Sequence, residues 1–285
     1  LMTTGKEKNV FNIAIEGNFD DCQNLVKAMF ADKPFAKEIK MSGVNSINWA
    51  RIIAQSVYYF YSYFLIDDNE KPINFSVPTG NFGDVYAGYL AKKIGLPINK
   101  FIVATNQNDI LHRAISKGTY NIEDVSETIT PSMDIQIASN FERLIYDLKD
   151  HSDKRTTEVM KNIKEKGKYV IDNESLNKIN IDFLSSKMDE NEVLETIKKV
   201  YENFNIVLDP HSAIGYGAFD KVNLNGSNIV LATAHPCKFP NAIEKAINVK
   251  AKLPKELAFV LDEKENYDII ENNLDKIKQH IKKRV

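Results

Sequence analysis

The sequence predicts an α/β protein with a mostly parallel, twisted sheet and helices on both of its faces. Short apolar runs alternate with longer segments of helical spacing along most of the 285 residues. Turns rich in glycine, proline or aspartate separate them. Hydrophobic residues make up 43% of the chain, which suffices for one large core or two smaller ones. Strands that alternate with helices pair in parallel, because each helix returns the chain to the starting edge of the sheet.

The expected elements follow in order from their apolar spacing and from the residues that end them. The first strand, 10–15, ends at Gly17, and a helix with apolar residues three and four positions apart follows. A long helix from Ile47 to about residue 66 ends in the polar run 67–72. The later elements are strands at 73–77, 101–104 and 228–232, and helices at 85–94, after Asp109, through 141–148 and after Asp209.

Two further segments bear on how the chain is organised. Residues 150–205 are rich in Lys, Glu and Asn and have helical spacing, with Gly167 as their single glycine, so we expect a peripheral helical insertion there. The chain opens Leu1-Met2-Thr3-Thr4, which resembles the interior of a protein. We therefore expect it to be part of a longer polypeptide.

The turn at 79–84, Thr-Gly-Asn-Phe-Gly-Asp, joins an expected buried strand to a helix and is the most informative segment. Gly80 and Gly83 let the backbone turn sharply and approach a ligand. The N–H groups of the first helical turn, helped by the helix dipole, then favour an anion. Neither a Walker loop nor the dinucleotide fingerprint is present, and a plain turn capped by Asn81 or Asp84 is the alternative. We expect this turn to hold a phosphorylated cofactor or substrate.

A second turn, 233–236, also follows an expected strand, so both turns are expected at the ligand-binding edge of the sheet, facing one cleft. Other ligand classes are disfavoured. The net charge is −2, the pI is about 6.3, and no basic stripe with aromatic residues predicts a nucleic-acid partner. The apolar run 58–66 is too short to span a membrane. Cys22 and Cys237 lack metal or disulfide spacing, which predicts a reducing, cytoplasmic location, and no metal site is expected.

Seven segments, in order along the chain, resemble threonine synthase, a pyridoxal-phosphate (PLP) enzyme of the tryptophan synthase β-like fold type II. The resemblance covers most of the chain and is weakest at 150–205 and in the last thirty residues. The segments are E-G-N-F-D-D-C-Q (16–23), N-S-I-N-W-A-R (45–51), P-T-G-N-F-G-D (78–84), A-T-N (104–106), P-S-M-D-I (131–135), S-N-F-E-R-L (139–144) and T-A-H-P (233–236).

The resemblance implies a cofactor site. The cradle for the PLP phosphate maps onto Gly80, Asn81, Phe82, Gly83 and Asp84. A hydroxyl against the pyridine nitrogen maps onto Thr233, and a neutral hydroxyl leaves that nitrogen largely unprotonated. Judged from the sequence alone, Thr233 is a plain cap before a proline.

The implied reaction converts O-phospho-L-homoserine and water to L-threonine and phosphate. A second phosphate then needs cationic and amide groups. Our candidates are Asn48 and Arg51, which share one helix face, with Asn140 and Arg143 as a second pair. A surface salt bridge is the alternative for Arg51.

The family's Schiff-base lysine lies in a Lys-Asp motif upstream of this chain, and Lys238 does not occupy its position. The resemblance therefore implies a C-terminal portion: 1–45 as the remainder of a smaller domain and 46–285 as the large PLP-binding domain. The missing N-terminal portion is the expected partner, and the chain alone is expected to be inactive. His211 and His235 are expected to be structural.

Two other functions stay open. One is a different fold type II enzyme, such as a threonine dehydratase, against which the segments at 46–51 and 139–143 argue. The other is a non-catalytic protein that binds a phosphorylated ligand without a Schiff base. Competition by phosphohomoserine separates the first from threonine synthase, and an upstream lysine excludes the second. The sequence leaves the oligomeric state open.

Overall fold

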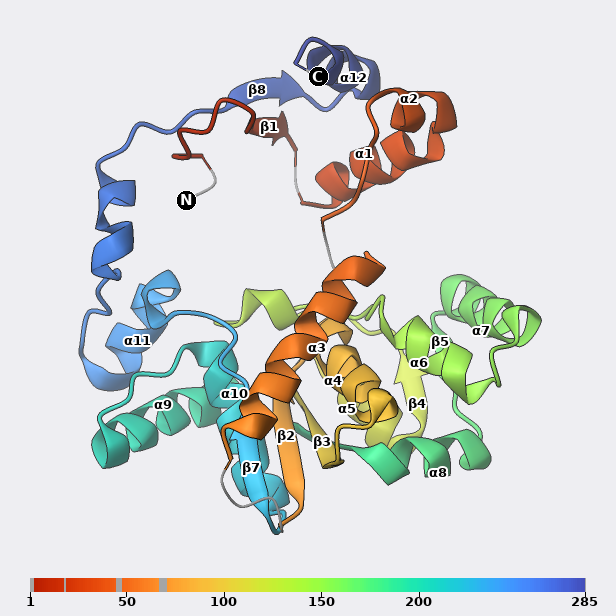
Figure 1. Cartoon of the computed structure of the whole chain (residues 1–285), viewed down its shortest axis with the longest axis vertical. Coiled ribbons are helices and arrows are strands. Elements are labelled where there is room, and N and C mark those ends of the chain that lie inside the picture. The colour runs from red at the N-terminus through yellow and green to blue at the C-terminus, as the bar shows by residue number, and fades with distance from the viewer. Residues whose placement is uncertain (1–2, 18, 45–47, 67–70, 285) are drawn as a thin grey trace. The chain divides into compact units, whose positions relative to one another are not determined.

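A computed structural model describes residues 3–17, 19–44, 48–66 and 71–284, so residues 45–47 of the N-S-I-N-W-A-R segment and Asn18 lie outside the described part. The chain folds into two compact units, Leu1–Gly43 with Leu253–Val285 and Val44–Lys252 (Figure 1). The expected assignment of the last residues to the large domain differs from this grouping, because a C-terminal strand pairs with the N-terminal one.

The first unit is built on two parallel strands. Strand β1 (Ile13–Glu16) pairs with β8 (Asp268–Glu271), a strand that the sequence analysis did not predict. Leu25, Met29, Phe35 and Ile277 form its small core. Its helices are α1 (Phe19–Ala31), α2 (Lys33–Glu38) and α12 (Leu274–Lys282), and the short helix η3 (Lys255–Leu261) also belongs to this unit.

The second unit contains a four-stranded sheet in the order β6-β3-β2-β7, and every neighbouring pair is parallel. Its strands are β2 (Ile73–Pro78), β3 (Ile98–Thr105), β6 (Phe183–Lys187) and β7 (Ser227–Val230). Strand β6 corrects the expectation of a peripheral insertion at 150–205, because this segment supplies an edge strand of the sheet. This strand was not predicted because it is only five residues long and lies between two helices that are rich in charged residues.

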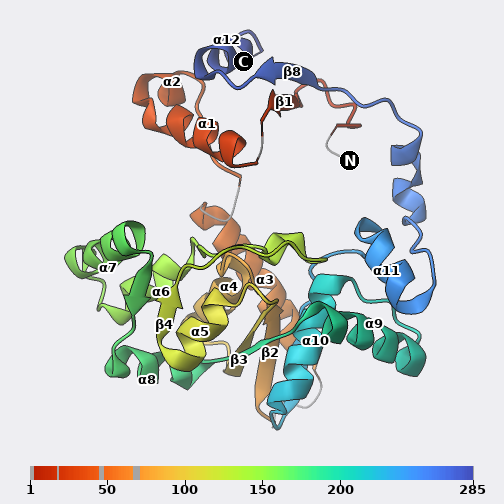
Figure 2. The same ribbon diagram turned by 180° about the vertical axis from the view of Figure 1, so that it is seen from behind.

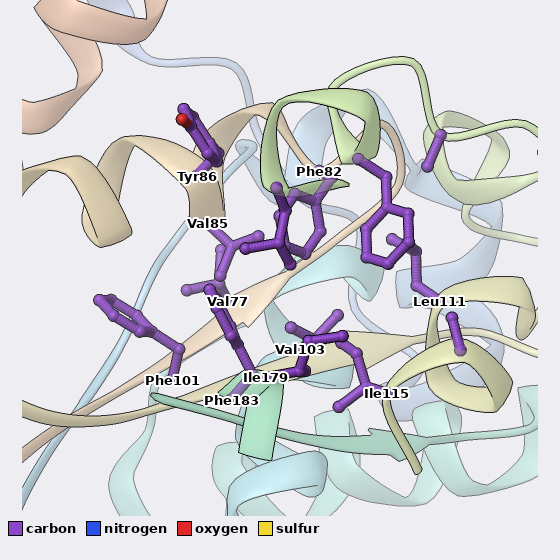
Figure 3. Close-up of a cluster of buried hydrophobic side chains, with 14 of the residues drawn as sticks. Val77, Phe82, Val85, Tyr86, Phe101, Val103, Leu111, Ile115, Ile179 and Phe183 are labelled. Carbon is purple, nitrogen blue, oxygen red and sulfur yellow. The ribbon is translucent and has the colours of Figure 1, made fainter. Parts of the chain in front are cut away.

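Helices cover both faces of this sheet, as predicted. Side chains alternate between the faces of a strand, so Phe101 and Val103 of β3 enter one core and Ile102 and Ala104 enter the other. Figure 3 shows Phe101 and Val103 together with Val77. The first core is lined by α3 (Trp49–Phe64), α4 (Gly83–Ile94), α5 (Ile110–Lys117), α6 (Phe141–Leu148), α7 (Asp153–Lys166) and α8 (Asn173–Asp182). The second is lined by α9 (Glu190–Phe204), α10 (Pro210–Val222) and α11 (Pro240–Ile247), which Figure 2 shows in front.

Smaller elements complete the second unit. Strands β4 (Thr119–Asn121) and β5 (Lys168–Val170) form an antiparallel pair, and η1 (Pro131–Met133) and η2 (Pro236–Lys238) are single helical turns. No helix in the described ranges is long and apolar enough to cross a membrane.

Candidate functional site

The two turns singled out in the sequence lie at one edge of the sheet. Strands β2 and β7 are parallel neighbours, with Ser76 opposite Val230. The N–H of Leu231 donates to the carbonyl of Ser76 at 3.1 Å, which continues this register past the end of β7. Both turns therefore follow the carboxyl ends of adjacent parallel strands, the edge at which such sheets bind ligands.

The turn after β2 leaves the N-terminus of α4 without a capping side chain. Phe82 occupies the N-cap position with a φ of 63°, a left-handed conformation that is uncommon outside glycine. Its ring lies in the buried cluster of Figure 3. It meets the ring of Phe141 edge-on, with the ring centroids 5.2 Å apart. The alternative of a turn capped by Asn81 or Asp84 is thus wrong. Among the described residues, no side chain accepts from the first N–H groups of α4, an arrangement that suits an anion such as a phosphate.

Gly80 is required by a close approach of two backbone segments. A Cβ atom there would lie 2.5 Å from the carbonyl oxygen of Ser132. Next to it, Asn81 is exposed, and its Oδ1 accepts from the N–H and the hydroxyl of Ser139, each at 3.4 Å. The carbonyl of Asn81 accepts from the N–H of Asn140 at 3.1 Å. The turn is therefore held against two other loops, and its uncapped N–H groups fit an anion such as a phosphate.

The carboxylate of Asp84 is engaged by α3. The hydroxyls of Tyr58 and Tyr59 both donate to its Oδ1, the second at 3.0 Å. Burial raises the pKa of the Asp84 carboxyl, and it also raises the pKa of Tyr59. Of the five residues assigned to the cradle, Asp84 and Phe82 consequently have side chains turned into protein contacts, which leaves their backbone N–H groups for a ligand.

A half-buried network of polar side chains supports the turn and was not predicted from the sequence. Asp134 Oδ1 accepts from Asn106 Nδ2 at 2.7 Å, from Asn108 Nδ2 at 2.9 Å and from the hydroxyl of Thr128 at 2.7 Å. These bonds fix the loop that carries Ser132, whose carbonyl packs on Gly80. The sequence feature that could have indicated this network is the pair Asn106 and Asn108, which closely follow the apolar strand at 101–104.

The turn after β7 is hydrogen-bonded to the first turn of α10. The N–H of exposed Thr233 donates to Ser212 Oγ at 3.1 Å, and Ser212 donates to Asp209. Asp209, His211 and Ser212 are all buried. His235 Nδ1 accepts from the N–H of Cys237 at 3.2 Å and so caps η2, in agreement with the structural role expected for it.

One of the two candidate substrate-binding pairs lines a cleft. Arg143 Nε donates to Asn140 Oδ1 at 2.9 Å, and its guanidinium lies 5.1 Å from the ring centroid of Trp49. These three residues, together with Tyr86 and Asp147, border a cleft of about 840 Å³. The N–H of Asn140 also donates to the carbonyl of Asn81, so the cleft adjoins the 79–84 turn.

The other pair serves the N-terminus of α3. Asn48 Oδ1 accepts from the N–H of Ala50 at 2.9 Å and caps the helix, and Arg51 Nη1 donates to the carbonyl of Val44 at 3.3 Å. Neither residue lines the cleft, although both neighbour Trp49, which does. The role of Asn48 as a cap is one that its position before an apolar helix predicts.

Two buried polar atoms near the cleft lack a partner among the described residues. They are Asn140 Nδ2 and Thr156 Oγ1, and both residues line the cleft. Buried polar groups are nearly always hydrogen-bonded, so these atoms favour a polar ligand there. No group of three or more His, Cys, Asp or Glu side chains in the described ranges is placed to hold a metal ion.

Known proteins similar to this chain are threonine synthases. The model of the family described as threonine synthase, C-terminal, matches residues 212–281. The threonine synthase of Pseudomonas aeruginosa is 44% identical over 98% of this chain and 60% of its own length, and that of Saccharomyces cerevisiae is 42% identical over 90% and 55%. The chain thus spans about 60% of the length of the Pseudomonas relative.

Solved structures agree. The PLP-bound threonine synthase of Brucella melitensis superposes with a TM-score of 0.94 at 42% identity, over 99% of this chain and 61% of that one. The yeast enzyme gives 0.89 at 39% identity, over 99% and 61%. The predicted fold class, including fold type II, is confirmed.

Proposed function

This chain belongs to the threonine synthase family, and we propose that it forms the cofactor-binding and part of the substrate-binding side of an enzyme that converts O-phospho-L-homoserine and water to L-threonine and phosphate. The observation that carries the proposal is that the uncapped N-terminus of α4 and Thr233 follow the carboxyl ends of two adjacent parallel strands, β2 and β7. Threonine dehydratase and a non-catalytic binding protein are not favoured, because the similar proteins are threonine synthases over nearly the whole chain.

Pyridoxal 5'-phosphate is the proposed cofactor, as in the Brucella enzyme. The N–H groups of residues 80–84 would hold its phosphate, and the α4 dipole favours that charge. Thr233, which follows the neighbouring strand β7, would meet the pyridine nitrogen. When bound, the cofactor would supply an electron sink that stabilises negative charge on the substrate carbons.

The substrate phosphate is assigned to the cleft beside the turn. A guanidinium binds phosphate through two parallel N–H groups, and Arg143 is already oriented by Asn140 and by the ring of Trp49. The unpartnered Nδ2 of Asn140 gives a further donor. Asn48 and Arg51, which lie in the first turn of α3 on either side of Trp49, remain proposed as further substrate-binding residues.

The catalytic lysine is proposed to come from the part of the family's sequence that this chain does not match. The unit Val44–Lys252 would then be the cofactor-binding domain, and residues 1–43 would belong to the smaller domain. We place the protein in the cytoplasm on the basis of Cys22 and Cys237, both of which are free thiols.

A titration of the chain with pyridoxal phosphate tests the cofactor site. We expect saturable binding by absorbance, weakened about tenfold in Asn81→Ala, which removes the bonds that hold the turn to Ser139, and in Thr233→Ala, which removes the hydroxyl proposed to meet the ring. Asn24→Ala, an exposed position on α1, is the matched control and should bind like the parent chain.

Borohydride reduction followed by mass spectrometry completes the test. We expect no lysine of this chain to become covalently modified. A trapped lysine would overturn the assignment of the catalytic lysine to other residues of the family's sequence. Absence of any saturable binding would overturn the proposed cofactor site.

A further inference from the structure

The N-terminus of α10 contains three buried polar residues whose role the sequence did not reveal. Asp209, His211 and Ser212 are 1%, 5% and 2% exposed. A carboxylate at such a depth must be hydrogen-bonded, because burying a lone charge is very costly. Asp209 Oδ1 accepts from the N–H of His211 at 2.9 Å and from its Nδ1 at 3.2 Å, while Oδ2 accepts from Ser212.

These bonds fix the direction of a short chain of hydrogen bonds. Burial alone would raise the pKa of Asp209, but the bonds from His211 and Ser212 outweigh it and lower the pKa. As a carboxylate, Asp209 can only accept, so Ser212 must give its single hydroxyl proton to it. The lone pairs of Ser212 Oγ are then left for the N–H of Thr233, at 3.1 Å.

Ser212 is itself held in place relative to the sheet. The carbonyl of Gly215, one turn further along α10, accepts from the hydroxyl of Ser76 on β2 at 2.6 Å. A Cβ on Gly215 would lie 3.0 to 3.1 Å from Val230 of β7 and Pro78 of β2. The first turns of α10 therefore pack closely against the ends of β2 and β7, the strands that the 79–84 and 233–236 turns follow.

We propose that Ser212, oriented by Asp209, is a positioning residue that holds Thr233 at the spacing from the 79–84 turn that a phosphorylated pyridine ring requires. The inference rests on the proposed cofactor site and deepens it. Thr233 is exposed and lies outside any strand or helix, so its place depends on contacts such as this one. We do not expect Ser212 to affect phosphate binding at the 79–84 turn, because other residues hold that turn.

Two ligands distinguish binding of the pyridine ring near Thr233 from binding of the phosphate at the 79–84 turn. Pyridoxine 5'-phosphate carries ring and phosphate but no aldehyde, so its affinity is independent of any lysine. Inorganic phosphate reports on the turn alone. Calorimetric titration should show Ser212→Ala binding pyridoxine 5'-phosphate about tenfold more weakly, with phosphate affinity changed by less than about twofold.

Further variants keep the test sharp. If Ser212 acts through Thr233, Ser212→Ala should add little in a Thr233→Ala background. Ser212→Thr, which retains the hydroxyl, should restore most of the affinity, and Asp209→Asn should reproduce the defect if Ser212→Ala fails to fold. Ser116→Ala on α5, where an exposed serine bonds to the carbonyl of His112, is the matched control.

The outcomes are distinguishable. An equal loss for both ligands, or additive losses in the double variant, would overturn the positioning role. Unchanged pyridoxine 5'-phosphate affinity in Ser212→Ala, with the parent chain binding both ligands, would overturn this inference and leave the cofactor site standing. A parent chain that binds neither ligand would overturn the cofactor site and the inference with it.

Discussion

The turns after β2 and β7 lie side by side but are built by opposite means. The first is anchored in the core by one of its own residues, Phe82, and is held against the loops that carry Ser132 and Ser139. The second carries exposed Thr233, whose N–H is held by one buried serine of α10. The first turn is therefore anchored by a residue within it, whereas the second depends on a contact with a residue twenty-one positions away.

The largest expected effect concerns the anchor of the first turn. Phe82→Ala removes a fully buried ring and should lower the free energy of unfolding by about 4 kcal/mol. Urea denaturation measures this. Phe204→Ala, at an exposed position on α9, should cost less than about 1 kcal/mol. Similar small losses for both variants would show that the first turn is not anchored by its own packing.

Gly80→Ala sharpens the comparison at the backbone. The new Cβ would meet the Ser132 carbonyl, so we expect a loss of about 3 kcal/mol, at the upper end for overpacking, and phosphate affinity lowered more than about tenfold. Gly95→Ala has open space but a φ of 121°, and should cost about 1 to 2 kcal/mol without changing phosphate affinity. Equal affinities in the two variants would contradict the proposed close approach.

The two turns should also differ in how acid affects them. The hydrogen bonds that lower the pKa of Asp209 stabilise the fold above the pKa of an unfolded aspartate, near 3.9, and this contribution is lost as pH falls through the lowered folded value. The Asp209→Asn variant should therefore be less stable than the parent chain at neutral pH, and its free energy of unfolding should fall less than that of the parent chain in acid. Unfolding followed between pH 2 and 7 tests it, with exposed Asp124→Asn as control.

Asp84 should show the reverse sign. Its pKa is raised in the folded state, so the fold binds more protons than the unfolded chain, and stability falls as pH rises above about 4. Asp84→Asn keeps an oxygen that can accept from Tyr58 and Tyr59, and should flatten this fall in the same series of unfolding experiments. An unchanged pH profile would show that the Asp84 carboxylate is not penalised by burial.

Several elements could be predicted because their signals are local. The strand at 73–77 is a continuous apolar run, and the helix after it begins at a glycine turn and ends before Gly95. Strands β6 and β8 were missed because each is short and flanked by charged residues. Their pairing, with β3 and β1, depends on residues far along the chain.

By itself, the sequence determined the parallel α/β fold, the glycine-bearing turn between β2 and α4, and the chain's likeness to threonine synthases, because these depend on contiguous residues. Only the tertiary structure decided that Asp84 faces two tyrosines of α3, that Arg143 stacks on Trp49 and that Ser212 lies beneath Thr233. Contacts of this kind arise from strand register and helix packing, which bring together side chains that no local pattern relates.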